Sequence, residues 1–191
     1  NVNEAPVITS GAAVSAAENQ TAVTTVASSD VDGGTPIYSI IGGADAALFS
    51  IDSATGVLTF NSAPDFEAPS DNGGNNVYDV TVRVIDGNGG SDTQALAVTI
   101  TNVNEAPVIT SNGGGATAAA SVAENQTAAT TVTSSDVDGG TPIYSIIGGA
   151  DAALFTIDSA TGVLTFNAAP NYEAPADAGG NNVYDVTVQV I

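Results

Sequence analysis

The side chains of this sequence that are equipped for chemistry are carboxylates, and they gather at a few points. In the first half these are Glu18 in Ala-Glu-Asn, Asp30 and Asp32 in Asp-Val-Asp-Gly, Asp65 and Glu67 in Asp-Phe-Glu, and Asp86 before Gly87. Side chains two residues apart point to the same side of an extended segment, so we expect both two-residue pairs to lie close together. Close carboxylates repel each other unless a cation lies between them, and Ca2+ takes six to eight oxygen ligands. The pattern therefore predicts oxygen-only sites for Ca2+, whereas Mg2+ would demand stricter octahedral geometry.

The composition excludes several classes of function. The 191 residues include 21 acidic side chains and one basic side chain, Arg83, and the formal net charge is -20. Without His or Cys the chain cannot form a zinc, haem or blue-copper site, or a nucleophile activated by histidine. One cation cannot supply a nucleic-acid-binding surface, and an anionic membrane would repel the chain. The absence of Lys excludes a Lys–Asn isopeptide crosslink, so only the carboxylates remain as candidates for chemistry.

The chain contains an internal repeat. Residues 1–10 recur unchanged as residues 102–111, and residues 18–85 match residues 124–191 at 59 of 68 positions. Self-similarity at a period of about 100 residues indicates an array of similar domains. We therefore expect a first repeat over 1–101, a linker over 102–107 and a second repeat over 108–191. A catalytic carboxylate pair repeated in every copy would be unusual, so we expect no enzyme.

The second copy stops before its last strand. Ile191 corresponds to Ile85, so the alternating segment Ser91–Ile100 has no counterpart in the sequence. We expect the second repeat to expose a sheet edge, either because the sequence is a piece of a longer protein or because an identical chain donates the strand. The start at Asn1 does not resemble a signal peptide. No run of about 20 apolar residues predicts membrane insertion.

Each copy reads as a series of short strands separated by turn residues. In the first copy the expected strands are 6–9, 12–17, 21–28, 36–41, 48–52, 56–60, 77–85 and 93–100. Alternation predicts inward-facing side chains at Val80, Val82, Val84, Leu96, Val98 and Ile100. Asp86–Gly90 has the composition of a hairpin turn, and only 44–47 could form a helical turn. This count predicts an all-β fold of two tandem Greek-key β-sandwiches of the cadherin or immunoglobulin type, with the last strand missing from the second.

Taken together, the motifs resemble tandem cadherin repeats, in the version found in large secreted bacterial adhesins. The matching elements are Ala-Glu-Asn, Asp-Val-Asp-Gly, Asp-Phe-Glu, Val-Ile-Asp-Gly and the linker Asn102–Pro107, in the family's order and over the whole chain. The resemblance implies Ca2+ ions shared by the base of one repeat, the linker and the top of the next. The implied ligands are Glu18, Asp65, Glu67, Asn102, Asn104, Glu105, Asp136 and Asp138. It also implies half-sites for neighbouring repeats at Asn3, Glu4, Asp30, Asp32 and Asp86, and at Glu124 and Glu173.

The sequence departs from the family pattern at several ligand positions. Asn102 stands where the family usually has Asp, and the second copy has Asn171-Tyr172-Glu173 in place of Asp-Phe-Glu. These changes imply fewer ions at a junction or weaker binding. The chain has no Trp, so the strand exchange of animal cadherins is not implied. An independent EF-hand-type loop over 86–92 is a less favoured alternative because its terminal Glu is missing.

The expected function is mechanical. Ca2+ between adjacent repeats would stiffen an extracellular array at the cell surface, whose partners are further repeats of the same polypeptide. Two alternatives remain open: a fibre of identical chains assembled by strand donation, and a directly adhesive module that binds its own kind or a carbohydrate. The remaining acidic residues Asp45, Asp52, Asp71, Asp79 and Asp92 are expected in turns or at the surface. The aromatic residues are expected mainly in the core.

Overall fold

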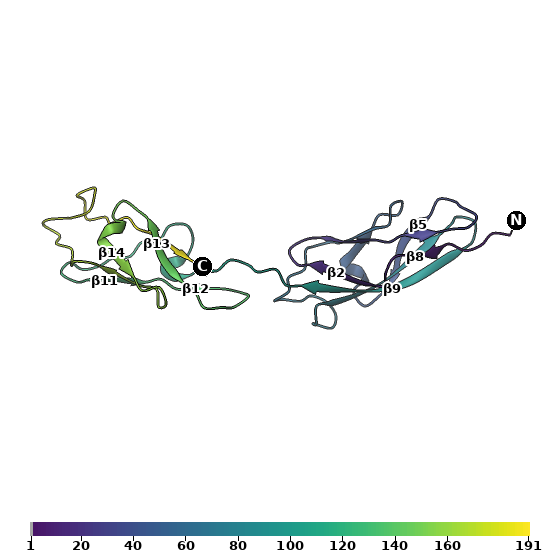
Figure 1. Cartoon of the computed structure of the whole chain (residues 1–191), viewed down its shortest axis with the longest axis horizontal. Helices are drawn as coiled ribbons and strands as arrows, with labels where there is room; N and C mark the ends of the chain where they lie inside the picture. The colour runs from purple at the N-terminus through teal and green to yellow at the C-terminus, as the bar shows by residue number, and fades with distance from the viewer. Residues whose placement is uncertain (1) are drawn as a thin grey trace. The chain divides into compact units, whose positions relative to one another are not determined.

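The computed structural model describes residues 2–191; Asn1, with which the first expected repeat begins, lies outside them. The described chain consists of short strands, loops and three single-turn 3-10 helices. It divides into two compact units, Asn1–Val103 (unit 1) and Asn104–Ile191 (unit 2), each built from β-sheets (Figure 1). Each unit is described by itself below.

Unit 1 contains a four-stranded and a three-stranded sheet. The larger sheet has the order β2 (Ala13–Ala17), β9 (Ser91–Thr101), β8 (Val77–Ile85) and β5 (Ile37–Gly42). The smaller sheet has the order β3 (Ala22–Thr25), β7 (Val57–Phe60) and β6 (Phe49–Ile51), and β1 (Val7–Ile8) pairs with β4 (Ser28–Ser29). All pairs are antiparallel except β2 with β9, which is parallel. The predicted all-β sandwich is confirmed.

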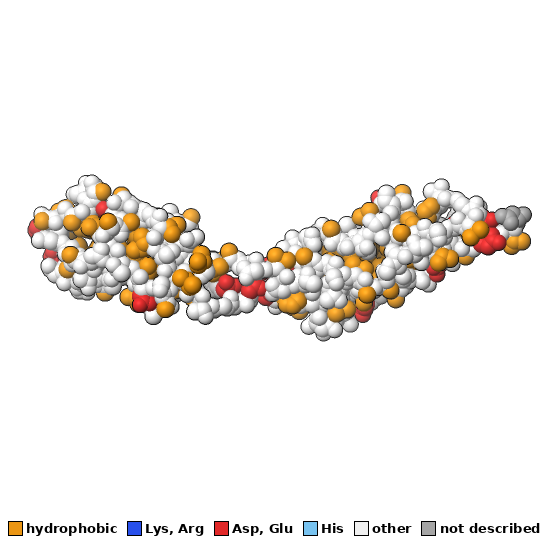
Figure 2. Space-filling model, viewed as in Figure 1, with side chains coloured by type: hydrophobic (Ala, Val, Ile, Leu, Met, Phe, Trp, Pro, Cys, Tyr) orange, Lys and Arg blue, Asp and Glu red, His pale blue; other side chains and the backbone are white. Residues whose placement is uncertain are grey.

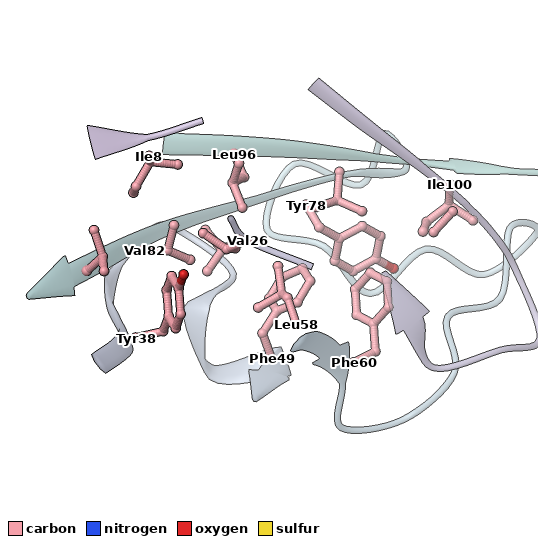
Figure 3. Packing of buried hydrophobic residues seen from close by; sticks show 14 residues of the cluster. Ile8, Val26, Tyr38, Phe49, Leu58, Phe60, Tyr78, Val82, Leu96 and Ile100 are labelled. Carbon is pink, nitrogen blue, oxygen red and sulfur yellow. The ribbon is translucent and has the colours of Figure 1, made fainter. Parts of the chain in front are cut away.

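The core of unit 1 lies between these sheets (Figure 3). All six predicted inward-facing residues of β8 and β9 are buried. They pack with Phe49, Leu58 and Phe60 of the smaller sheet, while Tyr78 meets Phe60 edge to face with ring centroids 5.1 Å apart. Because alternation with a period of two places every second side chain of a strand on the same face, the sequence pattern alone identified this half of the core.

Two elements differ from the expected strand pattern. The expected strand 21–28 divides into β3 and β4 because Val26 N leaves the ladder and donates to Gly56 O at 2.8 Å. Gly56 has φ +72, and a Cβ there would collide with Val26 O, so the turn requires glycine. The expected helical turn forms as the 3-10 helix η1 (Ala46–Leu48), one to two residues later than predicted.

Unit 2 repeats this plan with fewer paired strands. Its sheets are β11 (Ala128–Thr131) with β15 (Val163–Phe166) and β14 (Phe155–Ile157), β13 (Tyr144–Gly148) with β16 (Thr187–Val190), and β10 (Val108–Ile109) with β12 (Ser134–Ser135). Its 3-10 helices are η2 (Ser111–Gly113) and η3 (Ala152–Leu154). Within residues 2–191, β16 pairs only with β13, whereas its counterpart β8 pairs with β5 and β9. No helix of the described residues is long and apolar enough to cross a membrane.

Candidate metal-binding sites

One end of unit 1 collects all five residues of the predicted N-terminal half-site. Asp32 N donates to Asp30 Oδ1 at 2.9 Å, and Glu4 N donates to Asp32 Oδ2 at 2.7 Å. Asn3 Nδ2 donates to Asp86 Oδ2 at 2.8 Å. The turn after β8 and the segments before β1 and after β4 therefore bring their polar side chains to the same end of the unit.

The expectation of an extended Asp-Val-Asp segment is wrong. Asp30 is followed by a bend at Val31 and Asp32, and its carboxylate accepts the backbone N–H two residues ahead. This is an Asx turn, an arrangement that aspartate forms readily because its short side chain reaches its own backbone. Val31, between the two carboxylates, is 90% exposed. The turn brings the two acidic residues together by a local hydrogen bond rather than by strand alternation.

The electrostatics of this end reflect crowded negative charge. The pKa of Glu4 is raised, first by a hydrogen bond between its carboxyl and that of Asp32 and then by the charge of Asp32. The pKa of Asp32 is lowered, because the Glu4 carboxyl and the Glu4 N–H both donate to it. The pKa of Asp86 is lowered by the amide of Asn3, then by the N–H of Asn88. Carboxyls that lie this close repel each other when both are ionised, and a divalent cation would neutralise that repulsion.

One oxygen of this end provides a direct test of the fit to a cation. Asp30 Oδ2 is buried and accepts no hydrogen bond, although its partner oxygen Oδ1 does. A buried carboxylate oxygen without a partner is costly in a folded protein. The surrounding donors are carboxylate and amide oxygens, the set that a hard cation such as Ca2+ prefers. The residues present therefore fit Ca2+.

Unit 2 builds the same arrangement at the corresponding end. Asp138 N donates to Asp136 Oδ1 at 3.0 Å, and Glu105 N donates to Asp138 Oδ2 at 2.6 Å. Asn104 Nδ2 donates to the carbonyl oxygen of Glu105 at 2.8 Å. Glu105, Asp136 and Asp138 therefore repeat the hydrogen bonds of Glu4, Asp30 and Asp32.

The opposite end of unit 1 collects the predicted ligands Glu18, Glu67 and Asn102. Glu18 is only 3% exposed; its Oε2 accepts from Phe66 N at 2.8 Å and its Oε1 from Val103 N at 2.7 Å. Asn102 Nδ2 donates to Glu67 Oε1 at 2.8 Å. Two backbone N–H groups hold the buried Glu18, which thus ties the segment after β9 to the Asp65–Glu67 segment, whereas the side-chain amide of Asn102 holds Glu67.

Asp65 and Glu67 do not lie in an extended segment, contrary to expectation. Residues 66–68 form a bend, and Asp65 Oδ1 accepts from Ala68 N at 2.9 Å. The reason is again that aspartate caps the N–H groups that follow it. Asp65 therefore belongs to the same short segment as Glu67, with one of its oxygens engaged in the turn.

Unit 2 has the corresponding residues in a more open setting. Glu124 Oε2 accepts from Tyr172 N at 3.0 Å, and Glu173 N donates to Asn171 Oδ1 at 3.0 Å. Glu124 and Glu173 are exposed. Tyr172 is 66% exposed, so the expectation of a mainly core role is wrong for this aromatic residue. Its counterpart Phe66 is half-buried against the core of unit 1.

Asp45 and Asp71 lie in turns, as expected, but they are buried, and the sequence did not predict that they organise the backbone around them. Asp45 Oδ1 accepts from Asn72 N at 2.7 Å and its Oδ2 from Asp79 N at 2.8 Å. Asp71 accepts from Asn75 N and Asn76 N, each at 3.0 Å. Burial raises the pKa of Asp71, but hydrogen bonds from backbone N–H groups outweigh that effect and leave the pKa lowered. The glycine- and asparagine-rich segment 71–76 was the available signal for such a loop.

The Asp86 carboxylate is held by N–H groups of the turn after β8 and by the side chain of Asn3. Asp86 Oδ1 accepts from Asn88 N at 2.6 Å and from Gly90 N at 3.0 Å, while Oδ2 is held by Asn3. Asp92 accepts instead from Ile8 N at 2.8 Å. Acidic side chains form small groups on a surface that is mostly uncharged in the view of Figure 2.

Comparisons with known proteins agree with this architecture. Residues 12–101 match the family model described as "Cadherin domain", and no curated protein sequence matches the chain. The whole chain resembles the crystal structure of human protocadherin-24 EC1-2, with a TM-score of 0.57 and 22% identity over 100% of this chain and 94% of that one. It also resembles mouse cadherin-23 EC22-24, with a TM-score of 0.53 and 17% identity over 99% of this chain and 65% of that one.

At these identities the structural likeness establishes the fold alone. Cadherin domains are extracellular modules of cell adhesion that typically bind Ca2+ between successive repeats. The chain therefore has a cadherin-like β-sandwich fold over its full length, and its residues 12–101 match the cadherin domain itself.

Proposed function

We propose that this chain is a pair of calcium-rigidified extender repeats from an extracellular bacterial adhesin. The observation that carries the proposal is the group of carboxylates at one end of unit 1, in which Asp30 Oδ2 is buried without a hydrogen-bond partner. Unit 2 forms the same hydrogen bonds with Glu105, Asp136 and Asp138. The oxygen-only donor set and the cadherin domain match both favour Ca2+ over a transition metal.

Each repeat contributes part of the proposed site. The residues that would hold Ca2+ between the two repeats are Glu18, Asp65, Glu67, Asn102, Asn104, Glu105, Asp136 and Asp138. When bound, Ca2+ supplies the positive charge that allows these carboxylates to lie together. The same logic assigns Asn3, Glu4, Asp30, Asp32 and Asp86 to a junction with a preceding repeat, and Glu124 and Glu173 to one with a following repeat.

The chain's own residues would convert binding into stiffness. Glu18 accepts from Val103 N, so one ligand already restrains the first residues after β9. Glu105 N donates to Asp138, so the residues before β10 are restrained from the other side. Because the ligands come from both repeats, an ordered junction binds the ion better than a flexible one and its population rises with Ca2+. The formal charge of -20 opposes this order when no cation is present.

Calcium titration calorimetry tests the proposal from both sides of the junction. Glu67→Gln in unit 1 and Asp136→Asn in unit 2 should each weaken Ca2+ binding by tenfold or more, because each removes a charged ligand. Asp79→Asn is the matched control: Asp79 is an exposed residue of β8, and its substitution removes the same charge away from the ligands. Heat of binding that is unchanged in both ligand variants would exclude the proposed site.

A second candidate, assembly of identical chains by strand donation, is favoured by the one-sided pairing of β16 within the described residues. An unpaired sheet edge presents N–H and C=O groups to which another strand can bind. Sedimentation at increasing protein concentration separates the two candidates. A concentration-dependent polymer would support strand donation, and a monomer at every concentration would exclude it.

A further inference from the structure

The residue before β8 and its counterpart in unit 2 have an unusual backbone conformation. Asn76 has φ 60 and its counterpart Asn182 has φ 61, in the left-handed region that asparagine tolerates better than other residues with a side chain. Hydrogen bonds to both the N–H and the carbonyl oxygen of Asn76 hold this conformation. Asn76 N donates to Asp71 Oδ1, and the carbonyl oxygen of Asn76 accepts from Ile100 N at 2.9 Å.

This conformation directs the amide of Asn76 to the segment that carries the ligands. Asn76 Nδ2 donates to the carbonyl oxygen of Phe66 at 2.8 Å, and Asn182 Nδ2 donates to that of Tyr172 at 3.1 Å. On its other side, Phe66 N donates to Glu18 Oε2. Both backbone polar groups of the residue between Asp65 and Glu67 are therefore held, one by Glu18 and the other by Asn76.

The loop that presents Asn76 is itself anchored to the body of the unit. Buried Asp45 binds the N–H groups of Asn72 and Asp79, which flank the loop. In unit 2, Ala178 N and Asp185 N likewise donate to Asp151, at 2.7 and 2.8 Å. Since Ala178 replaces Asn72, the backbone N–H and not the side chain supplies this anchor. The amide of Asn76, by contrast, is retained as Asn182 and makes the same contact in both units.

We propose that Asn76 and Asn182 are positioning residues for the calcium ligands at the base of their repeats. They contact no carboxylate that we assign as a ligand. They act by fixing Phe66 or Tyr172, and with it the direction in which the acidic residues on either side point. The inference rests on the proposed calcium function, because its consequence is measured as Ca2+ affinity. Partners of this kind, one contact removed from the metal, typically change affinity by 10- to 100-fold when lost.

The decisive comparison is between Asn76→Asp and Asn75→Asp in the full chain. Asn76→Asp replaces the donor to Phe66 with an acceptor. Asn75→Asp adds the same charge one residue earlier. It also keeps a side-chain oxygen for Val77 N, which donates to Asn75 Oδ1 at 3.1 Å. We expect Asn76→Asp to weaken Ca2+ binding about tenfold relative to Asn75→Asp, by calorimetry. Asn76→Gly, which permits positive φ and adds no charge, should weaken binding similarly.

A second readout separates positioning from general stability. Hydrogen exchange in EGTA should show faster exchange at Phe66 N in the Asn76 variants, while the amides of β8 remain protected. Equal affinities of Asn76→Gly, Asn76→Asp and Asn75→Asp, with Glu67→Gln still impaired, would overturn the positioning role alone. Undiminished affinity in Glu67→Gln would instead overturn the proposed calcium function.

Discussion

Units 1 and 2 share 59 of 68 residues over their main body, yet their sheets are not equally complete. In unit 1, β8 spans nine residues between β5 and β9, and Tyr78 is 1% exposed. In unit 2 the corresponding β16 spans four residues and pairs with β13 only, and Tyr184 is half-buried. Since the sequences of the two strands differ at one position, Arg83 against Gln189, the difference arises from the pairing partner and not from local preference.

The same comparison applies to the ligands. Glu18 is buried and bound by two backbone N–H groups, one of them from Val103 after β9. Glu124 is exposed and accepts from Tyr172 N. The parallel pairing of β2 with β9 also has no counterpart at 119–123, which form no strand. A strand distant in sequence therefore completes both the sheet and the setting of the glutamate.

The largest expected effect comes from supplying unit 2 with a counterpart of β9. A copy of residues 86–101 joined after Ile191 should lengthen β16 and bury Tyr184, Val186 and Val188. Complete burial of such side chains contributes about 1.5–3 kcal/mol each, so unit 2 should gain at least about 3 kcal/mol in its free energy of unfolding. Hydrogen exchange of residues 183–190 measures the gain.

The control extension carries Ser in place of Leu96, Val98 and Ile100 in the added copy, and should give little protection. If residues 183–190 were equally protected with and without the added strand, the account of the difference between the units would be wrong.

Truncating equivalent tyrosines should cost the two units unequal amounts of stability. Tyr78→Ala should destabilise unit 1 by about 3–5 kcal/mol, the cost usual for truncating a buried aromatic side chain. Tyr184→Ala should cost unit 2 clearly less, because its side chain is only half-buried. Urea denaturation followed by residue-resolved NMR gives both values. Equal losses in the two units would contradict the unequal burial.

Substitution of Glu18 and of its counterpart Glu124 compares the two units by their effect on Ca2+ binding. Glu18→Gln should weaken Ca2+ binding by about tenfold or more, since it removes a ligand charge that the fold holds in place. Glu124→Gln should weaken Ca2+ binding less, because Glu124 is exposed and is assigned to a different junction. A larger loss from Glu124→Gln would reverse the assignment of the two ends.

The smallest expected effect is the pH dependence from Asp71 and Asp177. Hydrogen bonds from backbone N–H groups lower the pKa of Asp177, and for Asp71 such bonds outweigh its burial. A lowered pKa in the folded state adds stability above the unfolded value, near 3.9, and this stability is lost as the pH falls through the folded value. Wild type should therefore be more stable than Asp71→Asn at pH 7, with the gap closing progressively below about pH 5. A gap that widens on acidification would contradict this linkage.

The sequence predicted most of the fold because alternation and turn residues are local signals. The buried positions of β8 and β9, the hairpin at Asp86 and the short helical turn were all within reach of these signals. The geometry of the acidic motifs could not be predicted from these signals. Asp30 and Asp65 form turns through their own side chains, which a two-residue periodicity cannot represent.

Long-range contacts account for the remaining differences. Asp79 N donates to Asp45, 34 residues away in the sequence, and Val103 N donates to Glu18, 85 residues away. Neither contact has a local sequence pattern, so both partners look like ordinary polar residues until the sheets are assembled. The positive φ of Asn76 was similarly hidden, because asparagine is common in this loop and only one of three adopts it.

Small-angle X-ray scattering of the chain, in millimolar Ca2+ and then in EGTA, tests the central claim most directly. The account predicts a larger maximum dimension and a narrower distance distribution with Ca2+, and a response lost in Asp136→Asn and Glu67→Gln but retained in Asp79→Asn. Identical scattering in Ca2+ and EGTA would contradict calcium-dependent stiffening and leave strand donation as the stronger account.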